Sequence, residues 1–421
     1  MTHRSSFLTV AAVGLALSAP AWAGGGHIPV SVVPFQEPER WPYAVETTHT
    51  VVHYAAAGDR GMAESVAADL EFAWQAQIDE LGAAAPLDDG GLAGPDGRLD
   101  VYLWRGIDTF YVDAVADNPA TWWDDVSTYM VLDPWGKYGG PELAANLYHE
   151  LRHTSQAVDD WWEDYPVFEA EATLWESRAF GFARLAVVWS DYQAHPDWSP
   201  FRDDAYRTWF MYGGALYFDF VSRRYFGGEL GFSNQMWQLC RNPPGAELDP
   251  LLNEPDFADA LDHLLRDEGA SFLGSIVEFA RARWYTGARD LGLFSEGAVL
   301  PQPATRVHDR GGGSARSSVR VDAMLLGTAY VTVVRGPADP PELVVSLKRN
   351  GRDPVTFAVQ TVGRGSADAI LDLDGRTARV RFGPTGTASL AVTVMPPAGG
   401  VYDPDLAGDT RYSVDLVFDR R

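Results

Sequence analysis

Two histidines four residues apart, in the run Leu147-Tyr148-His149-Glu150-Leu151-Arg152-His153, constrain the fold of this chain more than any other feature. Residues four apart lie on one face of an α-helix, so the imidazoles of His149 and His153 can point at the same metal ion. Gly140-Pro141 before the run is typical of a helix start. The sequence therefore predicts a helix over residues 142–158 with two metal ligands on one face. The alternative is a pair of surface histidines on an amphipathic helix.

Acidic residues extend this metal-binding pattern. Glu150 directly follows the first histidine, where a carboxylate can accept a proton from a metal-bound water. A catalytic zinc ion needs a third protein ligand and keeps its fourth position open. A second helical pattern, over residues 168–188, follows a short connection and carries Glu169 and Glu171. We therefore expect two antiparallel helices with the metal between them.

The pattern resembles that of the gluzincins, which include the thermolysin-like peptidases and the thermolysin-like domains of zinc aminopeptidases. More closely, residues 149–176 look like a group of exported bacterial metalloproteases. In that group the zinc helix continues into Gln, Ala and Asp-Trp, and the next helix reads Phe-Glu-x-x-Ala-Thr-x-x-Glu. The matching residues here are Gln156-Ala157, Asp160-Trp161, Phe168-Glu169, Ala172-Thr173 and Glu176. The resemblance extends loosely over residues 53–227, which is less than half of the chain.

The resemblance implies one catalytic Zn²⁺ bound by His149, His153 and Glu169, with Glu150 as the general base. Only one of Glu169 and Glu171 can face the first helix, because residues two apart on a helix point about 200° away from each other. Small neighbouring side chains favour Glu169, whereas the longer spacing from His153 favours Glu171.

The sequence departs from thermolysin in two respects. Fewer residues separate His153 from Glu169, and Thr173 stands where thermolysin has an aspartate that orients a ligand histidine. Glu176 lies on the same helix face as Glu169, so we expect it to orient a ligand histidine instead.

Two further functional elements follow from the resemblance. Residues 211–216, Met-Tyr-Gly-Gly-Ala-Leu, are similar to the aminopeptidase segment whose tyrosine stabilises the oxyanion. Tyr212 is its expected counterpart here, with a core tyrosine as the alternative. The family also binds peptide along the strand before the zinc helix, and residues 127–132 occupy that place in the sequence.

The N-terminus predicts export. A short basic start precedes an apolar run from Phe7 to Leu17, and Ala21-Trp22-Ala23 supplies small residues for cleavage. Residues 1–23 are therefore expected to be a signal peptide, and the mature protein to be secreted or periplasmic. No cysteine follows the cleavage site, so we expect no lipid anchor. Cys240 is the one cysteine of the chain, and its apolar context predicts a buried side chain.

The formal net charge of −25 excludes two classes of partner. Nucleic acids and anionic lipids bind to clustered cations, which this chain does not offer. We expect no nucleic-acid binding and no stable insertion into membranes. Clustered aspartates in the Gly-rich region of residues 88–100 allow a Ca²⁺ site, although their spacing does not match an EF-hand and favours an acidic surface turn.

The C-terminal part has a different texture. Residues 301–317 are rich in proline and glycine and predict a linker. Short β-rich runs separated by turn residues follow, among them residues 329–333, 343–347 and 391–394. About eight such strands predict a β-sandwich over residues 318–421 that folds independently, is dispensable for chemistry and could bind a surface or partner.

The sequence thus predicts an α+β protein with a gluzincin-like domain over residues 24–300 and an all-β sandwich behind it. The expected activity is that of a secreted zinc metallopeptidase acting on peptide or protein substrates. Two alternatives stay open. One is an exported protein that binds a surface glycan or partner and has a residual or structural zinc site. The other is a zinc hydrolase of a non-peptide amide or ester.

Overall fold

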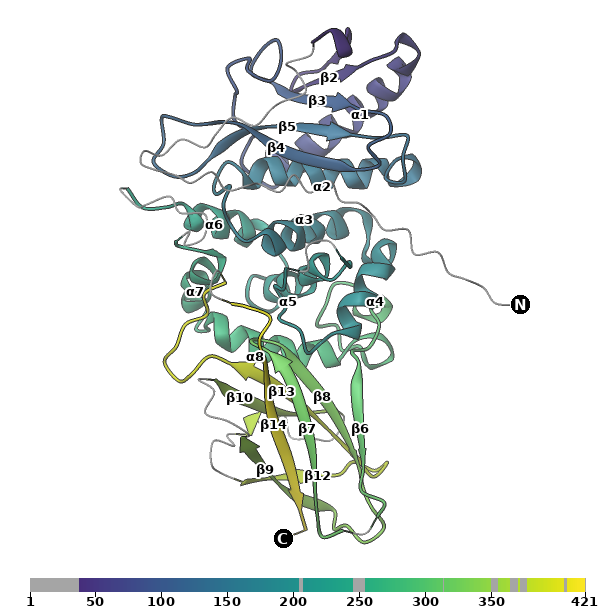
Figure 1. Ribbon diagram of the computed structural model, residues 1–421, viewed down its shortest axis with the longest axis vertical. Coiled ribbons are helices and arrows are strands. Elements are labelled where there is room, and N and C mark those ends of the chain that lie inside the picture. Colours follow the sequence, from purple (N-terminus) through teal and green to yellow (C-terminus); the bar gives the residue numbers. More distant parts are fainter. Residues whose placement is uncertain are drawn as a thin grey trace, which may run out of the picture.

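The computed structural model describes residues 38–203, 207–244, 254–312, 314–349, 355–363, 370–371, 377–404 and 407–420. The predicted signal peptide, residues 1–23, lies outside these ranges. The molecule is elongated, with a mixed sheet at one end, helices in the middle and all-β sheets at the other end (Figure 1). The chain is therefore α+β, with an all-β C-terminal part as expected.

The N-terminal sheet has the strand order β1-β2-β3-β5-β4. Strands β2, β3 and β5 run parallel, and β1 and β4 are antiparallel to their neighbours. Every residue of β3 and β5 is buried, as expected for strands covered on both faces. The sequence pattern of residues 50–54, 99–104 and 127–132 is typical of strands, and the structure confirms a strand in each of these segments. The bounds are β1 Tyr43–Glu46, β2 Thr50–Tyr54, β3 Leu99–Leu103, β4 Phe110–Asp117 and β5 Val126–Leu132.

The predicted role of residues 127–132 as a peptide-binding strand is wrong. These residues belong to β5, which pairs with β3 on one side and with β4 on the other. Both edges of β5 are occupied, so an extended peptide cannot add to it. The sheet ends instead at β4, which the sequence analysis did not identify as a strand.

Helices α1 and α2 cover one face of this sheet (Figure 1). Helix α1, Arg60–Trp74, continues into a π-helical turn at Gln75–Glu80 and packs against β2. Helix α2, Leu143–Gln156, contacts β4, β5 and α1. Leu147 and Leu151 of α2 are fully buried in the main core. This packing fixes the rotation of α2, so its histidine-bearing face points toward the next helical layer.

Helix α3 occupies the centre of the helical layer and contacts α2 and α5. It ends at Phe180, because Gly181 adopts a φ of +92° that a helix cannot continue. The predicted helix over 168–188 is therefore two helices. The spacing of apolar residues also predicts a helix over 206–225, but from residue 207 onward, where the structure is described, the α-helix begins only at Ala215. The bounds are α3 Tyr165–Phe180, α4 Ala186–Ala194, α5 Ala215–Tyr225, α6 Gly231–Cys240, α7 Phe257–Asp267 and α8 Phe272–Trp284, with 3₁₀ turns η6 at Phe182–Leu185 and η7 at Met211–Gly214.

The C-terminal sheets have the orders β11-β10-β13-β8-β6 and β12-β9-β14-β7. Val331 and Leu390 of the first sheet share a buried core with Val345 and Leu416 of the second. This shared core is the packing expected of a sandwich. The bounds are β6 Thr305–Asp309, β7 Arg316–Met324, β8 Thr328–Val334, β9 Glu342–Arg349, β10 Thr356–Val362, β11 Ile370–Leu371, β12 Thr377–Arg381, β13 Thr387–Met395 and β14 Arg411–Asp419.

The segment 301–317 is not simply a linker. It contains β6, which pairs in parallel with β8, and it ends at the start of β7. Proline and glycine flank β6 rather than interrupt it, so composition alone did not separate this strand from a loop.

The sandwich packs closely on the helical layer. Helix α8 contacts β10 and β13, the Tyr330 hydroxyl donates to the carbonyl of Ala280, and Gln360 Nε2 donates to the carbonyl of Val277 at 2.8 Å. Leu326 of the sandwich lies in the same core cluster as the helices. The middle of the sandwich therefore has a core of its own, as expected, whereas the end that faces the helices shares the helical core.

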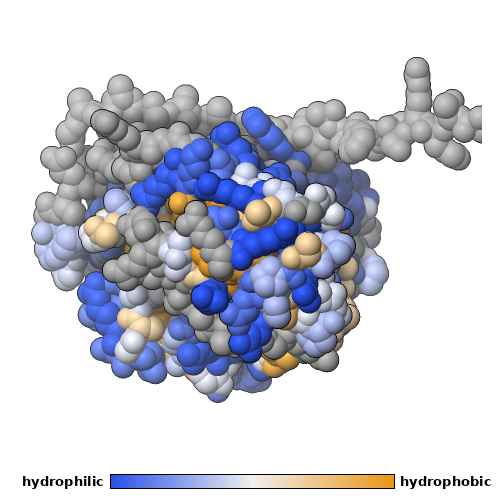
Figure 2. All heavy atoms as spheres, turned by 90° about the horizontal axis from the view of Figure 1, so that it is seen from below, coloured by the Kyte–Doolittle hydropathy of each residue, from blue (hydrophilic) through white to orange (hydrophobic). Residues whose placement is uncertain are grey.

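Within the described ranges, every helix is too short or too polar to cross a membrane. Figure 2 views the molecule from the sandwich end, where hydrophilic residues make up most of the coloured surface.

Candidate metal centre

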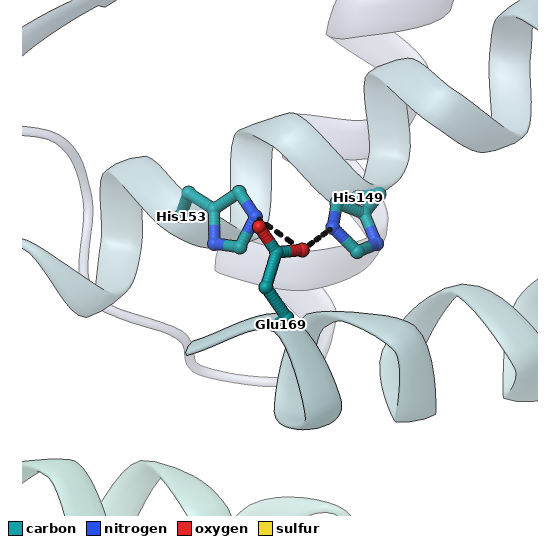
Figure 3. A group of neighbouring side chains, drawn as sticks. All are labelled: His149, His153 and Glu169. Atoms are coloured by element: carbon teal, nitrogen blue, oxygen red, sulfur yellow. Dashed lines mark hydrogen bonds and ion pairs between the residues drawn. The ribbon is translucent and has the colours of Figure 1, made fainter. Parts of the chain in front are cut away.

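Helices α2 and α3 bring His149, His153 and Glu169 together (Figure 3). Nε2 of His149 lies 3.1 Å from Oε2 of Glu169, and Nε2 of His153 lies 3.6 Å from the same oxygen. The three ligand atoms all lie within 4.8 Å of one another. Two imidazoles and one carboxylate converging in this way form a donor set that suits Zn²⁺. These residues therefore fit the predicted ion.

Glu171 has a different environment. Its carboxylate accepts hydrogen bonds from Nε and Nη2 of Arg152, at distances between 2.8 and 3.1 Å, and from Gln156 Nε2 at 2.6 Å. Both Arg152 and Glu171 are buried, so this ion pair is enclosed by protein. Of the two acidic residues considered for the third position, Glu169 is the one that faces both histidines.

The charges of the centre depend on one another. Burial by itself would raise the pKa of Glu169, but hydrogen bonds and charge from His149 and His153 lower it to about 2. Burial likewise opposes protonation of His149, yet the hydrogen bond and charge of Glu169 raise the pKa of that histidine. Without an ion, the anionic carboxylate therefore favours protonated imidazole. A bound cation would take over that compensating role.

Glu150 stands beside the centre without a structural partner. Within the described part of the chain its carboxylate forms no hydrogen bond or ion pair, and the residue is 9% exposed. Burial raises the pKa of Glu150, and the two histidines partly oppose that rise. A carboxylate that is not engaged in holding the fold is available to accept and return a proton.

His149 is oriented from behind by Glu176. Its Nδ1 lies 3.0 Å from Oε2 of Glu176, two helical turns after Glu169 on α3. Arg184, from η6, forms ion pairs with both Glu176 and Glu142. The structure thus places Glu176 where a carboxylate holds a ligand histidine in its metal-binding orientation. Thr173, in contrast, has a buried hydroxyl without a hydrogen bond within the described residues.

Two further residues that contact the candidate ligands or their partners were not predicted from the sequence. Gln156 Oε1 lies 2.7 Å from Nδ1 of His153. The i,i+3 spacing of these residues on one helix could have indicated the contact. Arg184 gave no comparable signal, because it reaches Glu176 from a separate element after the turn at Gly181.

Tyr212 lies near His149, with ring centroids 6.1 Å apart, and it is only partly buried. It comes from η7, which packs against α3. The ring of Phe168 lies 6.1 Å from that of His153. The tyrosine is therefore close to the predicted metal ligands, as the oxyanion role requires, although its neighbours also include Trp209.

The aspartates considered for Ca²⁺ have other partners. Asp88 accepts from the backbone N–H of Gly90 and Asp89 from those of Gly91 and Ala93, while Asp96 pairs with Arg98. A calcium ion would have to displace these interactions. The arrangement is that of an acidic turn.

A second buried acidic group lies near the end of the α2–α3 connection. Asp160, Glu163 and Cys240 bring their ligand atoms within 4.8 Å of one another. Both carboxylate oxygens of Glu163 accept backbone N–H groups, from Asp164 and Phe257, at 2.7 Å. Cys240 is buried as predicted, and burial raises the pKa of its thiol.

No protein-family model matches this sequence, and no curated protein matches it. Part of the chain is similar to two solved structures of periplasmic inhibitors of g-type lysozyme. PliG of Aeromonas hydrophila is 12% identical, and the match covers 28% of this chain and 98% of that one with a TM-score of 0.15. A mutant of PliG-Ec from Escherichia coli is 13% identical, with coverage of 28% and 98% and a TM-score of 0.16. Similarity at this level supports no statement about fold or function.

Proposed function

We propose that this protein is an exported zinc metallopeptidase. The observation that carries the proposal is the convergence of His149, His153 and Glu169 from two packed helices. The carboxylate of Glu150 lies near them and has no hydrogen bond or ion pair with any described residue. When bound there, a zinc ion would polarise a carbonyl and lower the pKa of a water molecule.

The chain's own groups perform the proton transfers in this proposal. Glu150 accepts a proton from the attacking water and later donates it to the leaving amine. The hydroxyl of Tyr212 donates to the oxyanion that forms on the attacked carbonyl. Glu176 keeps His149 oriented through the contact at Nδ1.

Strand β4 supports a peptide as the substrate. It is the last strand in the sheet order, and among the described strands only β5 pairs with it. An extended peptide can hydrogen-bond to such an edge, and β4 also contacts α2, the helix of the histidines. In this proposal the peptide therefore binds along β4 and not along β5.

Export rests on the sequence of residues 1–23, whose basic, apolar and small-residue parts follow the order of a signal peptide. Cys240 is the single cysteine of the sequence, so the chain forms no internal disulfide in an oxidising compartment.

One observation favours a second candidate, a structural metal site in a binding protein. His149, Glu150 and Glu169 are each 9% exposed or less. A structural zinc site is closed by four protein ligands, whereas a catalytic site keeps one position for water. Activity and metal content must therefore be measured on the same sample.

The test is to purify the exported protein, measure its zinc content, and assay casein hydrolysis before and after treatment with a chelator. We expect about one zinc per chain, loss of hydrolysis on chelation and recovery when zinc is restored. A stable zinc content without hydrolysis of casein or a peptide library would reject the peptidase and leave the structural site.

Glu150→Gln provides the control against a contaminating protease. The amide has nearly the same shape as the carboxylate but cannot act as the base. We expect retained zinc and a loss of at least about 10²–10⁴-fold in turnover. Undiminished turnover in the zinc-loaded variant would contradict the mechanism.

A further inference from the structure

The second ligand histidine is held by an amide whose orientation can be deduced. Nδ1 of His153 lies 2.7 Å from Oε1 of Gln156 on the same helix. An imidazole nitrogen can donate or accept, and the two ends of an amide are interchangeable in shape. The contact alone therefore does not say which nitrogen of His153 carries the proton.

The other end of Gln156 decides the question. Its Nε2 lies 3.1 Å from the carbonyl oxygen of Phe168 and 2.6 Å from Oε2 of Glu171. Both of these groups are acceptors, so only the amide NH₂ can face them. Turning the amide over would place its carbonyl oxygen against two other oxygens in a fully buried site. Gln156 must therefore present its carbonyl oxygen to His153.

Glu171 is itself fixed as an acceptor. Arg152 forms a two-pronged hydrogen bond with its carboxylate and lies over the ring of Trp175, with Cζ 4.3 Å from the ring centroid. Arg152 Nη1 also donates to Oδ1 of Asn234 at 3.0 Å. A guanidinium offers only N–H donors, so Oε2 of Glu171, which Arg152 Nε contacts at 2.8 Å, accepts hydrogen bonds.

From this chain of contacts we propose that Gln156 is a positioning residue of the metal centre. Held by its contacts with the carbonyl oxygen of Phe168 and the carboxylate of Glu171, it accepts a hydrogen bond from Nδ1–H of His153 and so leaves the Nε2 lone pair for the metal. Nε2 is also the nitrogen that lies 3.6 Å from Glu169. The inference rests on the proposed zinc site and adds the device that selects the tautomer of one ligand.

The test compares zinc affinity, measured by competition with a chromogenic chelator, in wild type and Gln156→Leu. Leucine fills a similar volume without an acceptor. Loss of a partner of a ligand histidine typically weakens metal binding about 10–100-fold, and we expect a loss in that range. An unchanged affinity in the variant, beside a wild type that binds zinc, would overturn the inference but leave the proposed function intact.

Gln193→Leu is the matched control. Gln193 is also a buried glutamine held by an arginine, but its hydrogen bonds go to Arg283, Thr286 and Pro301. Its replacement is expected to lower thermal stability without changing zinc affinity. An equal loss of affinity in both variants would show a general packing effect and contradict a specific role for Gln156.

A measurement on the unmodified protein covers the case in which Gln156→Leu does not fold. Nitrogen-15 NMR of histidine-labelled, zinc-loaded wild type separates Nδ1-protonated from Nε2-protonated rings. His153, assigned by comparison with a His153→Gln sample, is expected to carry its proton on Nδ1. A proton on Nε2 would overturn the inference, and a wild type that binds no zinc would overturn both it and the proposed function.

Discussion

At the scale of single residues, Glu169 and Glu171 lie two positions apart on the same helix but have different partners. Both are buried, yet one faces two histidines and the other faces an arginine. A buried carboxylate needs a compensating charge or a metal, because desolvation otherwise costs several kcal/mol. Arg152 compensates Glu171 permanently, which leaves Glu169 as the acid whose partners can be reorganised around an ion.

Replacing each acid by alanine should therefore give different results. We expect Glu169→Ala to lose zinc on dialysis, because a ligand is missing. Glu171→Ala should weaken zinc binding without abolishing it, and should lower the stability of the metal-free protein by roughly 3–5 kcal/mol, because Arg152 is left buried and unpaired. Zinc stoichiometry and thermal unfolding check both. Retained zinc in the first variant and lost zinc in the second would reverse the assignment.

Asp339 is a comparable compensated acid in the sandwich. Burial would raise its pKa, but hydrogen bonds from Arg310 and Arg420 hold the pKa well below the usual value. A depressed folded-state pKa means that the stabilisation is complete above the unfolded value of about 3.9 and is lost as the pH falls below it.

Asp339→Asn should consequently lower the free energy of unfolding by roughly 3–5 kcal/mol at pH 7, since it leaves the buried Arg310 and the partly buried Arg420 without this counter-charge. The difference from wild type should shrink as the pH falls below about 4, because the carboxyl of the unfolded chain then takes up a proton while the native carboxyl stays charged. Denaturant unfolding at several pH values measures this. Glu342→Gln, at a surface ion pair with Arg381, is the control and should leave the free energy of unfolding nearly unchanged.

At the scale of elements, the position of Tyr212 depends on how closely η7 approaches α3 and α4. A Cβ on Gly214 would lie 2.9 Å from Cβ of Ala170 on α3, and one on Gly213 would lie 2.3 Å from Cβ of Tyr192 on α4. Only glycine at both positions permits this separation. Because Gly213 and Gly214 have no side chains, η7 can approach α3 and α4 closely. This approach places Tyr212 beside the candidate metal centre.

Gly214→Ala should force η7 away from α3. Overpacking of this kind typically costs about 1–3 kcal/mol. If Tyr212 has the proposed role, turnover should fall while the zinc content stays unchanged. Thermal unfolding, zinc content and peptide turnover are the measurements.

Gly231→Ala at the start of α6 is the control for this substitution. Its new Cβ would meet no heavy atom within 4 Å, so neutral or slightly increased stability is expected. Wild-type stability and turnover in Gly214→Ala would show that the close approach is not required.

At the scale of the whole molecule, the sandwich supplies part of the wall of the helical core. Leu326, Met395 and Tyr402 lie in the same cluster as the helices, and the rings of Tyr330 and Trp284 pack in a tilted arrangement with centroids 5.4 Å apart. No side chain of the candidate centre comes from the sandwich. Its contribution is therefore expected to be stability rather than chemistry.

A fragment of residues 24–304 should show this difference. Removing the sandwich exposes apolar surface on α8 and its neighbours, which favours aggregation and a lower unfolding temperature. Size-exclusion chromatography and thermal unfolding of the fragment and the full chain provide the comparison. A monomeric fragment as stable as the full chain would restore the simpler expectation of two independent domains.

Local patterns determined much of the helical layer. The spacing of His149 and His153 predicted α2. Serine before an apolar run is a typical helix cap, and Oγ of Ser271 accepts from the N–H of Gly274 at the start of α8. The choice of Glu169 over Glu171 also followed from helix geometry together with a family resemblance. Such features depend on residues within a few turns of each other, so their physical cause is contained in a short stretch of sequence.

Only the tertiary structure decided the features that depend on distant partners. It placed β5 between β3 and β4, turned part of the predicted linker into β6, and brought Arg184 to Glu176. Strand order and buried ion pairs join residues far apart in the sequence, so no local period records them. The sequence by itself predicted the helices that carry His149, His153 and Glu169 and singled these residues out as candidate ligands. The packing of the helices between the sheet and the sandwich decided which side chains hold the candidate ligands in position.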